Sequence, residues 1–466
     1  MVSKDNIILT SVKNLEIGLP KEEPVLPDSL YQMRLEKVLG SMKSNDYEYL
    51  LIYADREHYS NFDFLAGFDP RFEEALLVLR KDGRASCLLG NECLNLHKIG
   101  RIPMEGILYQ AFSLPGQPID KLEDLTEILK KLGIVNGDKV GIVGWKLMYP
   151  RYGTKDVFDV PAYLVDAARR AVGTGAVENA TDLFIHPAYG VRIVNTADDI
   201  ALYEFGAAYA SETLMDLIDA VQPGMTELEA SCKMQFGGLP LSCHPLTLSG
   251  ERCDRGLVSP TTKVIELGDR FNCSNGLRGG LSCRTGFMAE SEKDLPDGAE
   301  NYLDVVAKPY YATVVNWYEM IGIGVHCADL YRMVQDTYPK EKYGWVLNPG
   351  HLVSTEEWLS SPIAEDSDVV IRSGMCFQMD IIPAPPKPYA GANCEDGLAI
   401  ADEELRNELK EKYPEVWKRI ELRRKHMMEV LGIQLKPEIL PLSNLAATYR
   451  PYFMAKDKAL VCLKGC

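Results

Sequence analysis

Short apolar runs alternate with longer helix-like runs over residues 28–172, and this alternation constrains the fold more than any other feature of the sequence. Apolar runs bounded by turn residues are typical of buried strands, whereas apolar positions that recur every three or four residues indicate helices. Lys81-Asp82-Gly83 is a turn signal that joins two of the apolar runs as a hairpin. Strands that alternate with helices predict a mixed α/β domain. The predicted strands are Leu50–Ile52, Ala75–Leu79, Ala85–Leu89 and Lys139–Val143, and the predicted helices are 28–44, Ile119–Leu132 and Val160–Val172.

A second part of the chain begins near Pro187 and opens with a strand-like run, Val191–Val194. Thr196 and Asp199 predict the start of a long helix, because a hydroxyl at the N-cap and an acidic residue in the first turn both stabilise helix N-termini. Pro223-Gly224 predicts the end of that helix.

A chain of 466 residues is too long for one ordinary core. We therefore expect two domains, at residues 1–185 and 186–466. Within the second domain, residues 402–431 have a helical pattern that Pro414 interrupts. The last 35 residues are punctuated by prolines and are expected to wrap back on the core as coil.

Composition excludes several functional classes. The formal net charge is −17, and the chain lacks the basic footprint that nucleic-acid binding needs. No run of 18 apolar residues is present, so we expect no membrane span, and residues 1–20 contain no signal-peptide pattern. The 12 cysteines include no CxxC pair and are expected to be reduced thiols, which favours the cytoplasm.

A series of motifs follows in fixed order along the chain. The element Asn61-Phe-Asp-Phe-Leu-Ala-Gly-Phe68 comes first, followed by a helix flanked by Arg192–Ile200 and Val221–Glu229. The later motifs are Leu248-Ser249-Gly250, Leu267-Gly268-Asp269, Asn348-Pro349-Gly350-His351, Arg372-Ser373-Gly374-Met375 and Glu395-Asp396-Gly397. In this order and spacing they resemble the creatinase/aminopeptidase P/prolidase superfamily over roughly residues 30–400.

This resemblance implies an α/β fold in which a smaller creatinase-type N-terminal domain precedes a "pita-bread" domain. The latter domain has a curved, pseudo-twofold antiparallel sheet, and members of the superfamily bind substrate in its concave face. The resemblance also implies a homodimer, in which the N-terminal domain of one subunit roofs the site of the other.

The metallopeptidases of this superfamily hold two divalent metals with four carboxylates and one histidine. Carried onto this chain, the first two carboxylate positions fall on Ser274 and Cys283, the histidine is His351, and the last two carboxylates are Asp380 and Glu395. The loss of two aspartates argues against a two-metal centre. Cys283, His351, Asp380 and Glu395 remain as an acceptable ligand set for one Zn²⁺ or Fe²⁺. The alternative is that Cys283 is an ordinary buried thiol.

Two histidines that bind substrate in the superfamily are also missing, because their positions fall near Leu257 and on Trp358. Creatinase resembles the metallopeptidases in fold but cleaves a carbon–nitrogen bond without metal, with a catalytic histidine. His244 is the nearest candidate for that role, although it lies several residues too early. A cleft-facing histidine there would suit general acid–base catalysis. We predict catalytic roles for His351, Asp380, Glu395 and His244.

Substrate contacts are predicted for Phe68, Arg71, Ser274, Arg284 and Trp358. In creatinase-like dimers the loop that matches Arg71 reaches the neighbouring cleft with an arginine that grips the substrate carboxylate. A planar guanidinium suits that contact, and an ion pair of Arg71 with Glu73 or Glu74 is the alternative. Glu356 and Glu357 are expected on a solvated surface.

Three functions follow from the sequence. The main prediction is a creatinase-like hydrolase of a carbon–nitrogen bond in a small, carboxylate-bearing substrate, metal-free or with one metal. The second is a metallopeptidase of the Xaa-Pro aminopeptidase or dipeptidase type. The third is a binding module for a ligand or peptide that retains the fold without the chemistry.

Overall fold

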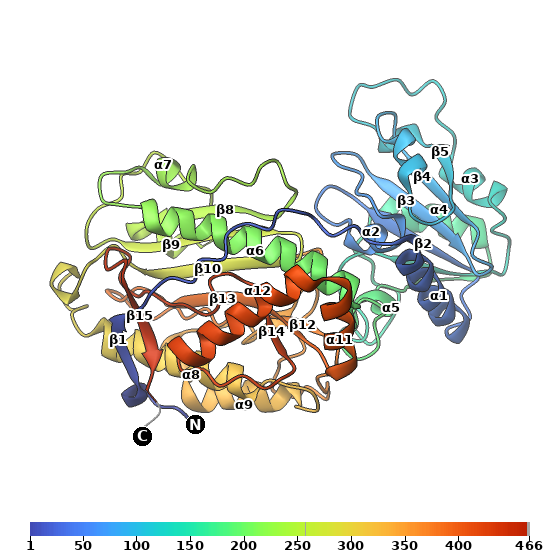
Figure 1. Ribbon diagram of the computed structural model, residues 1–466. Helices are drawn as coiled ribbons and strands as arrows, with labels where there is room; N and C mark the ends of the chain where they lie inside the picture. Colours follow the sequence, from blue (N-terminus) through green and yellow to red (C-terminus); the bar gives the residue numbers. More distant parts are fainter. Residues whose placement is uncertain (257, 464–466) are drawn as a thin grey trace. The chain divides into compact units, whose positions relative to one another are not determined.

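The first predicted domain is a mixed sheet covered by helices, as the alternation of strands and helices indicates (Figure 1). The computed structural model describes residues 1–256 and 258–463. The strand order is β5-β4-β3-β2-β6-β7, with β2 antiparallel to β3 and parallel to β6. Its strands are β2 Tyr49–Ala54, β3 Ala75–Arg80, β4 Ala85–Leu89, β5 Glu105–Leu108, β6 Lys139–Val143 and β7 Ala176–Asn179. Its helices are α1 Asp28–Ser44, α2 Ser60–Ala66, α3 Leu125–Lys131, α4 Ala162–Val172 and α5 Asp182–Ile185.

The second sheet is antiparallel throughout and has the order β11-β12-β13-β10-β9-β8, with β14 paired to β13. The strands are β8 Leu241–Ser249, β9 Arg270–Leu277, β10 Gly280–Phe287, β11 His351–Leu352, β12 Cys376–Met379, β13 Asn393–Ile400 and β14 Ile439–Pro441. The helices of this part are α6 Ala197–Ala220, α7 Glu227–Ser231, α8 Lys308–Met320, α9 Cys327–Thr337, α10 Lys340–Tyr343, α11 Glu403–Lys412 and α12 Pro414–Lys425. The mixed α/β class with a curled antiparallel sheet, predicted from the sequence, is confirmed.

The chain divides into two compact units, Leu26–Ile193 and a second unit that begins at Val194 and also includes Met1–Val25. The boundary falls a few residues after the predicted one at residue 185. The larger difference from the predicted domains concerns residues 1–25, which were predicted to belong to the first domain. Strand β1 (Ile7–Ser11) pairs antiparallel with β15 (Lys458–Cys462), and these backbone hydrogen bonds attach the segment to the second unit (Figure 1).

Helix α6 lies along β9 and β10 and begins and ends where the sequence indicates (Figure 1). The Thr196 side chain accepts a hydrogen bond from the Asp199 backbone amide, and the Asp199 carboxylate accepts one from the Thr196 amide. Gly206 allows close packing on the sheet, since a Cβ at this position would lie 1.8 Å from the carbonyl oxygen of Arg278. This contact sets the height of α6 above the β9–β10 hairpin.

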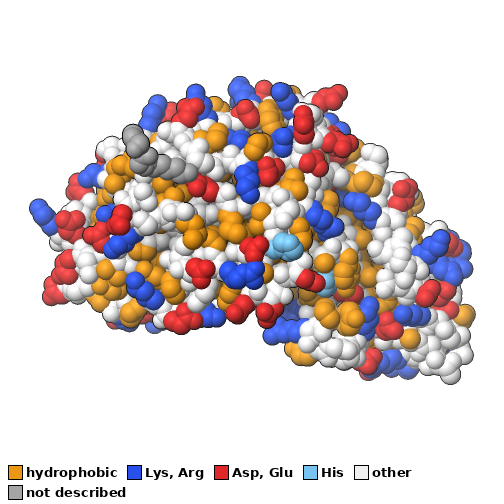
Figure 2. Space-filling view, turned by 90° about the horizontal axis from the view of Figure 1, so that it is seen from below, with side chains coloured by type: hydrophobic (Ala, Val, Ile, Leu, Met, Phe, Trp, Pro, Cys, Tyr) orange, Lys and Arg blue, Asp and Glu red, His pale blue; other side chains and the backbone are white. Residues whose placement is uncertain are grey.

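Three local predictions differ from the structure. Residues 191–194 form turns rather than a strand, and the helix predicted from Ile119 begins only at Leu125, after the N-cap Asp124. The proline-rich C-terminal segment contains β14 and β15, so it is not only coil. Pro414 separates α11 from α12 as expected. Within residues 1–256 and 258–463, no helix combines the length and the apolar character that a membrane span requires. On the face of the molecule that Figure 2 shows, acidic and basic side chains are interspersed.

Candidate functional site

The floor of the candidate site is set by the register of three neighbouring strands. Ser274 on β9 pairs with Cys283 on β10, and Cys283 pairs with Glu395 on β13. Side chains of residues in register point to the same face of a sheet. We call Ser274, Cys283 and Glu395 the acid row, after the carboxylate of Glu395. All three line a cleft of about 550 Å³ in the second unit.

A second row lies beside the acid row, two residues away from it on each of the three strands. Asn272 pairs with Thr285, and Thr285 pairs with Asn393. We call these three residues the amide row. They line the same cleft, because alternate residues of a strand share a face.

The acid row ends at a buried cluster of His351, Asp380 and Glu395. His351 is the first residue of β11, and Asp380 directly follows β12. The His351 Nε2 atom lies 3.9 Å from Glu395 Oε1 and 4.0 Å from Asp380 Oδ2. One ligand atom from each of the three residues lies within 4.8 Å of the others. The structure therefore brings together the three residues that the sequence motifs placed far apart.

Glu357 and Trp358, in the segment that follows β11, complete the surroundings of His351. Glu357 Oε1 lies 3.1 Å from His351 Nε2, and the indole of Trp358 stacks on the imidazole with ring centroids 4.0 Å apart. The prediction that Glu357 lies on a solvated surface is wrong, because it lines the cleft with 24% of its side chain exposed. Trp358 lines the cleft as well, so its predicted place beside a substrate fits its position.

The other imidazole nitrogen fixes the tautomer of His351. His351 Nδ1 lies 3.2 Å from the backbone carbonyl oxygen of Leu352, and a carbonyl can only accept a hydrogen bond. Nδ1 is therefore the protonated nitrogen. In the neutral imidazole, Nε2 then presents a lone pair to the carboxylates of Glu357, Asp380 and Glu395.

Burial and crowding of like charges shift the acid–base properties of the cluster. Burial raises the pKa of Asp380 to about 7, although the neighbouring His351 opposes this change. Burial, together with the charge of Asp380, raises the pKa of Glu395 well above its usual value. Burial alone would lower the pKa of His351, but the carboxylates of Glu357, Glu395 and Asp380 outweigh it and raise the pKa to about 10.

The donor set fits one divalent metal ion. Imidazole nitrogens and carboxylate oxygens are ligand types that Zn²⁺ accepts, and His351 has the backbone hydrogen bond from its second nitrogen that metal-ligating histidines commonly make. Among the described residues, Asp380 Oδ1 has no hydrogen-bond partner although it is buried. A cation would satisfy that oxygen and neutralise the carboxylates.

Cys283 lies outside this closely spaced group, so the structure does not bring the predicted fourth metal ligand together with the other three. Burial raises the pKa of its thiol far above the usual value, and the Glu395 carboxylate raises it further. The Asn272 side-chain amide donates a hydrogen bond to the sulfur over 3.4 Å. Cys283 is therefore a buried neutral thiol in the floor of the cleft. Ser274 is also buried in that floor and lines the cleft, as its predicted substrate contact requires.

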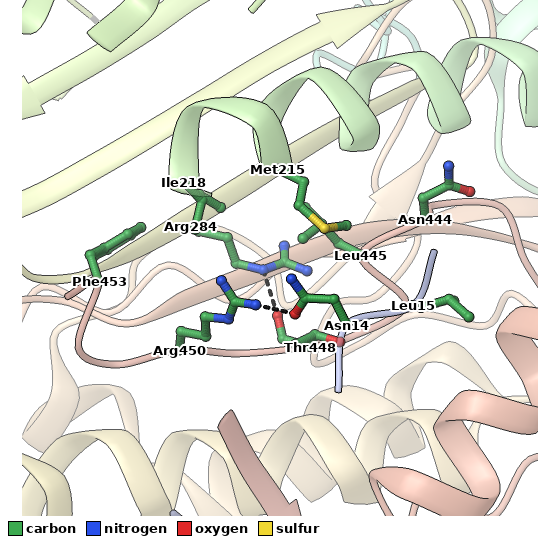
Figure 3. A pocket seen from close by; sticks show the side chains of 10 residues that line it. All are labelled: Asn14, Leu15, Met215, Ile218, Arg284, Asn444, Leu445, Thr448, Arg450 and Phe453. Carbon is green, nitrogen blue, oxygen red and sulfur yellow. Dashed lines mark hydrogen bonds between the residues drawn. The ribbon is translucent and has the colours of Figure 1, made fainter. Parts of the chain in front are cut away.

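Arg284 has a structural role, and its predicted contact with substrate is wrong. Its guanidinium binds the Asp396 carboxylate over 2.6 Å and donates hydrogen bonds to the backbone carbonyls of Cys283 and Glu395. It also donates to the backbone carbonyl of Thr448 (Figure 3). Because Arg284 follows Cys283 on β10, its side chain lies on the opposite face of the sheet from the cleft. Figure 3 shows it beneath α6, among residues of the N- and C-terminal segments.

The remaining predicted residues lie outside this cluster. His244 is exposed and is not among the described residues that line the cleft, so the structure gives no support to its catalytic role. Phe68 is buried in the first unit and packs edge-on against Phe62, and its contact with a substrate stays a prediction. The position near Leu257 lies outside the described residues. Arg71 is exposed and pairs with Asp69, not with Glu73 or Glu74. Its contact with a neighbouring subunit stays a prediction.

Comparisons with known proteins identify the fold. The chain matches the structure of an Xaa-Pro dipeptidase from Bacillus anthracis with a TM-score of 0.59 and 16% identity, over 80% of this chain and 96% of that one. A prolidase from Thermococcus sibiricus matches with a TM-score of 0.64 and 16% identity, over 80% and 95%. An X-Pro aminopeptidase from Thermotoga maritima matches with a TM-score of 0.60 and 14% identity, over 79% and 95%.

The chain therefore has the pita-bread fold of these structures, and the resemblance predicted from its motifs is confirmed for the fold. No model of a protein family matches the sequence, and no curated protein sequence matches it either. The fold is thus established through three-dimensional similarity at low sequence identity. The site must be interpreted from its own residues.

Proposed function

We propose that the protein is a peptidase-type hydrolase that cleaves an amide bond of a short peptide in the cleft above the acid row. The observation that carries this proposal is the buried cluster of His351, Asp380 and Glu395 at the end of that row. The solved structures of the same fold are those of an Xaa-Pro dipeptidase, a prolidase and an X-Pro aminopeptidase, so Xaa-Pro peptides are the first substrates to test.

The cluster has the capacity for one divalent metal ion, held by His351, Asp380 and Glu395. When bound, such an ion supplies polarisation of a carbonyl oxygen and lowers the pKa of a water molecule. A second ion has less support, because Ser274 and Cys283 stand where the resemblance implies two further carboxylates. A neutral hydroxyl and a buried thiol of raised pKa are poor substitutes for them.

Glu357 and Trp358 supply the remaining functions that the chemistry needs. The Glu357 carboxylate is partly exposed to the cleft, so it can accept a proton from an attacking water and return it to the leaving nitrogen. The indole of Trp358 packs flat on His351, which fixes the ring orientation. Its cleft-facing surface offers an apolar plane for the ring of a substrate proline.

The test combines metal analysis with kinetics on a matched pair of variants. We expect the protein purified without chelators to contain about one equivalent of metal and to hydrolyse Xaa-Pro peptides. Glu357→Gln should lower kcat by about 100-fold or more, as expected for the loss of a general base. Glu356→Gln is the control, because the adjacent glutamate does not line the cleft. Two equivalents of metal, or equal activity of both variants, would contradict the proposal.

A metal-free hydrolase of the creatinase type is the second candidate, and the contact between Glu357 and His351 favours it. Protonated His351 would neutralise part of the charge of the surrounding carboxylates without any ion. This candidate predicts no metal and turnover of a guanidino or amide substrate that bears a carboxylate. Absence of metal together with absence of turnover would instead favour the binding module.

A further inference from the structure

The cleft has an end, at Arg270, that the proposed chemistry does not use. Arg270, the first residue of β9, lines the same cleft as Asn272 and Ser274, because the three alternate along one strand. Its guanidinium binds the carboxylate of Asp254, and the Lys387 ammonium lies 2.8 Å from the other oxygen of that carboxylate. Arg270 and Lys387 therefore share one carboxylate, and the charge of Glu251 also acts on Arg270.

The distance between the two ends is set by strand geometry. Arg270 lies four residues before Ser274 on β9, and a strand advances about 3.4 Å per residue, so their Cα atoms are roughly 13 Å apart. An extended peptide advances about 3.3–3.6 Å per residue. The arginine side chain covers part of this distance, and the peptide must cover the rest. A peptide whose scissile bond lies over the acid row therefore needs about two or more residues beyond that bond for its terminal carboxylate to reach Arg270.

The amide row lies between the two ends and is suited to a peptide backbone. It contains two side-chain amides and a hydroxyl, and the Asn272 amide nitrogen already donates to the Thr285 hydroxyl and the Cys283 sulfur. The Oδ1 atom of Asn393 is buried without a hydrogen-bond partner among the described residues. A buried unpaired acceptor costs free energy that a donor from a ligand would recover. A peptide N–H placed over this row would supply that donor.

We propose that Arg270 forms a subsite for the C-terminal carboxylate of a peptide that extends at least two residues beyond the bond held at the acid row. This inference rests on the proposed function for the position of the scissile bond. It assigns the protein substrates longer than a dipeptide. Asp254 competes with the ligand for Arg270, since the carboxylate of Asp254 already binds that side chain.

The test measures binding in the presence of a chelator, so that metal-dependent cleavage does not consume the peptides. Calorimetry would compare Ala-Pro-Ala-Ala as the free acid and as the C-terminal amide. We expect wild-type protein to prefer the free acid by about tenfold, the effect of one partly exposed charge-assisted hydrogen bond. Arg270→Gln should remove this preference without changing the affinity for the amide, and Arg270→Lys should retain part of it. Asp254→Asn should increase the preference, because it removes the competing carboxylate.

Arg332→Gln on α9 is the matched control, because Arg332 is exposed, pairs with Asp329 and does not line the cleft. It should leave both affinities unchanged. Equal binding of acid and amide by wild-type protein, or a preference that survives Arg270→Gln, would overturn the subsite. So would a failure of both peptides to bind. A preference for the acid that depends on Arg270, in protein that never cleaves the peptide, would support the subsite and contradict the proposed hydrolase.

Discussion

Stability of the metal-free protein should fall as the pH is raised from 6.5 to 8.5. The pKa of His351 in the fold is about 10, compared with 6.5 for an ordinary histidine. A group whose pKa is raised by folding contributes stability that is fully present below the unfolded value and is lost as the pH rises towards the folded value. The pKa values of Asp380 and Glu395 are also raised, so these two groups act in the same direction.

The magnitude follows from proton linkage. In the unfolded state, half of the molecules have lost the His351 proton at pH 6.5 and nearly all have lost it at pH 8.5. The folded protein retains this proton over the same range. This difference lowers the free energy of unfolding by about 2 kcal/mol over the two pH units. Buried His426 has a lowered pKa and contributes below this window, and the cysteine thiols, with an ordinary value of 9.0, contribute mainly above it.

Urea unfolding in the presence of a chelator, followed by circular dichroism at several pH values, measures the effect. His351→Gln should reduce the slope, while His326→Gln should retain it, because His326 is exposed. Saturation with Zn²⁺ or Mn²⁺ should reverse the trend, because the imidazole must lose its proton before it binds a metal. A free energy of unfolding that stays constant or rises with pH in the chelated wild-type protein would refute this reasoning.

Three further predictions concern other parts of the structure. Arg284→Met should destabilise the protein by about 3–5 kcal/mol in urea unfolding, because it leaves Asp396 buried without its partner; an unchanged midpoint would restore Arg284 as a candidate for substrate binding. Gly206→Ala should cost about 1–3 kcal/mol or more, since the added methyl would overlap the Arg278 carbonyl, and a thermal melt identical to wild type would contradict the close packing of α6. Glu357→Gln should lower the pKa of His351 in metal-free protein, measured by NMR titration of the imidazole, because it removes the nearest carboxylate; an unchanged titration would show that the 3.1 Å contact is absent in solution.

Much of the architecture could be predicted from local patterns. Capping at Thr196 and the proline after α6 determine that helix, because both signals act within one turn of the chain. The order of the motifs determined which residues gather at the end of the acid row. The motifs predict His351, Asp380 and Glu395 together, and in the structure one ligand atom from each lies within 4.8 Å of the others.

The alternation of side chains along a strand bears directly on part of the predicted site. Cys283 and Arg284 are neighbours on one strand, so only one of them can face the cleft. The same alternation could have placed Arg270, Asn272 and Ser274 on a single face. Once a strand has been identified, the face on which each of its side chains lies follows from the two-residue repeat of the strand.

Tertiary structure alone decided the rest. By itself the sequence determined the α/β class, the helix ends and the ordered motifs, because these depend on contacts between near neighbours or on matched spacing. It could not determine that Glu357 reaches His351, since that contact depends on the path of the segment after β11. Nor could it attach the first 25 residues to the second unit, because β1 pairs with a strand more than 400 residues away in the chain. Such long-range pairings depend on the whole fold, which no local pattern specifies.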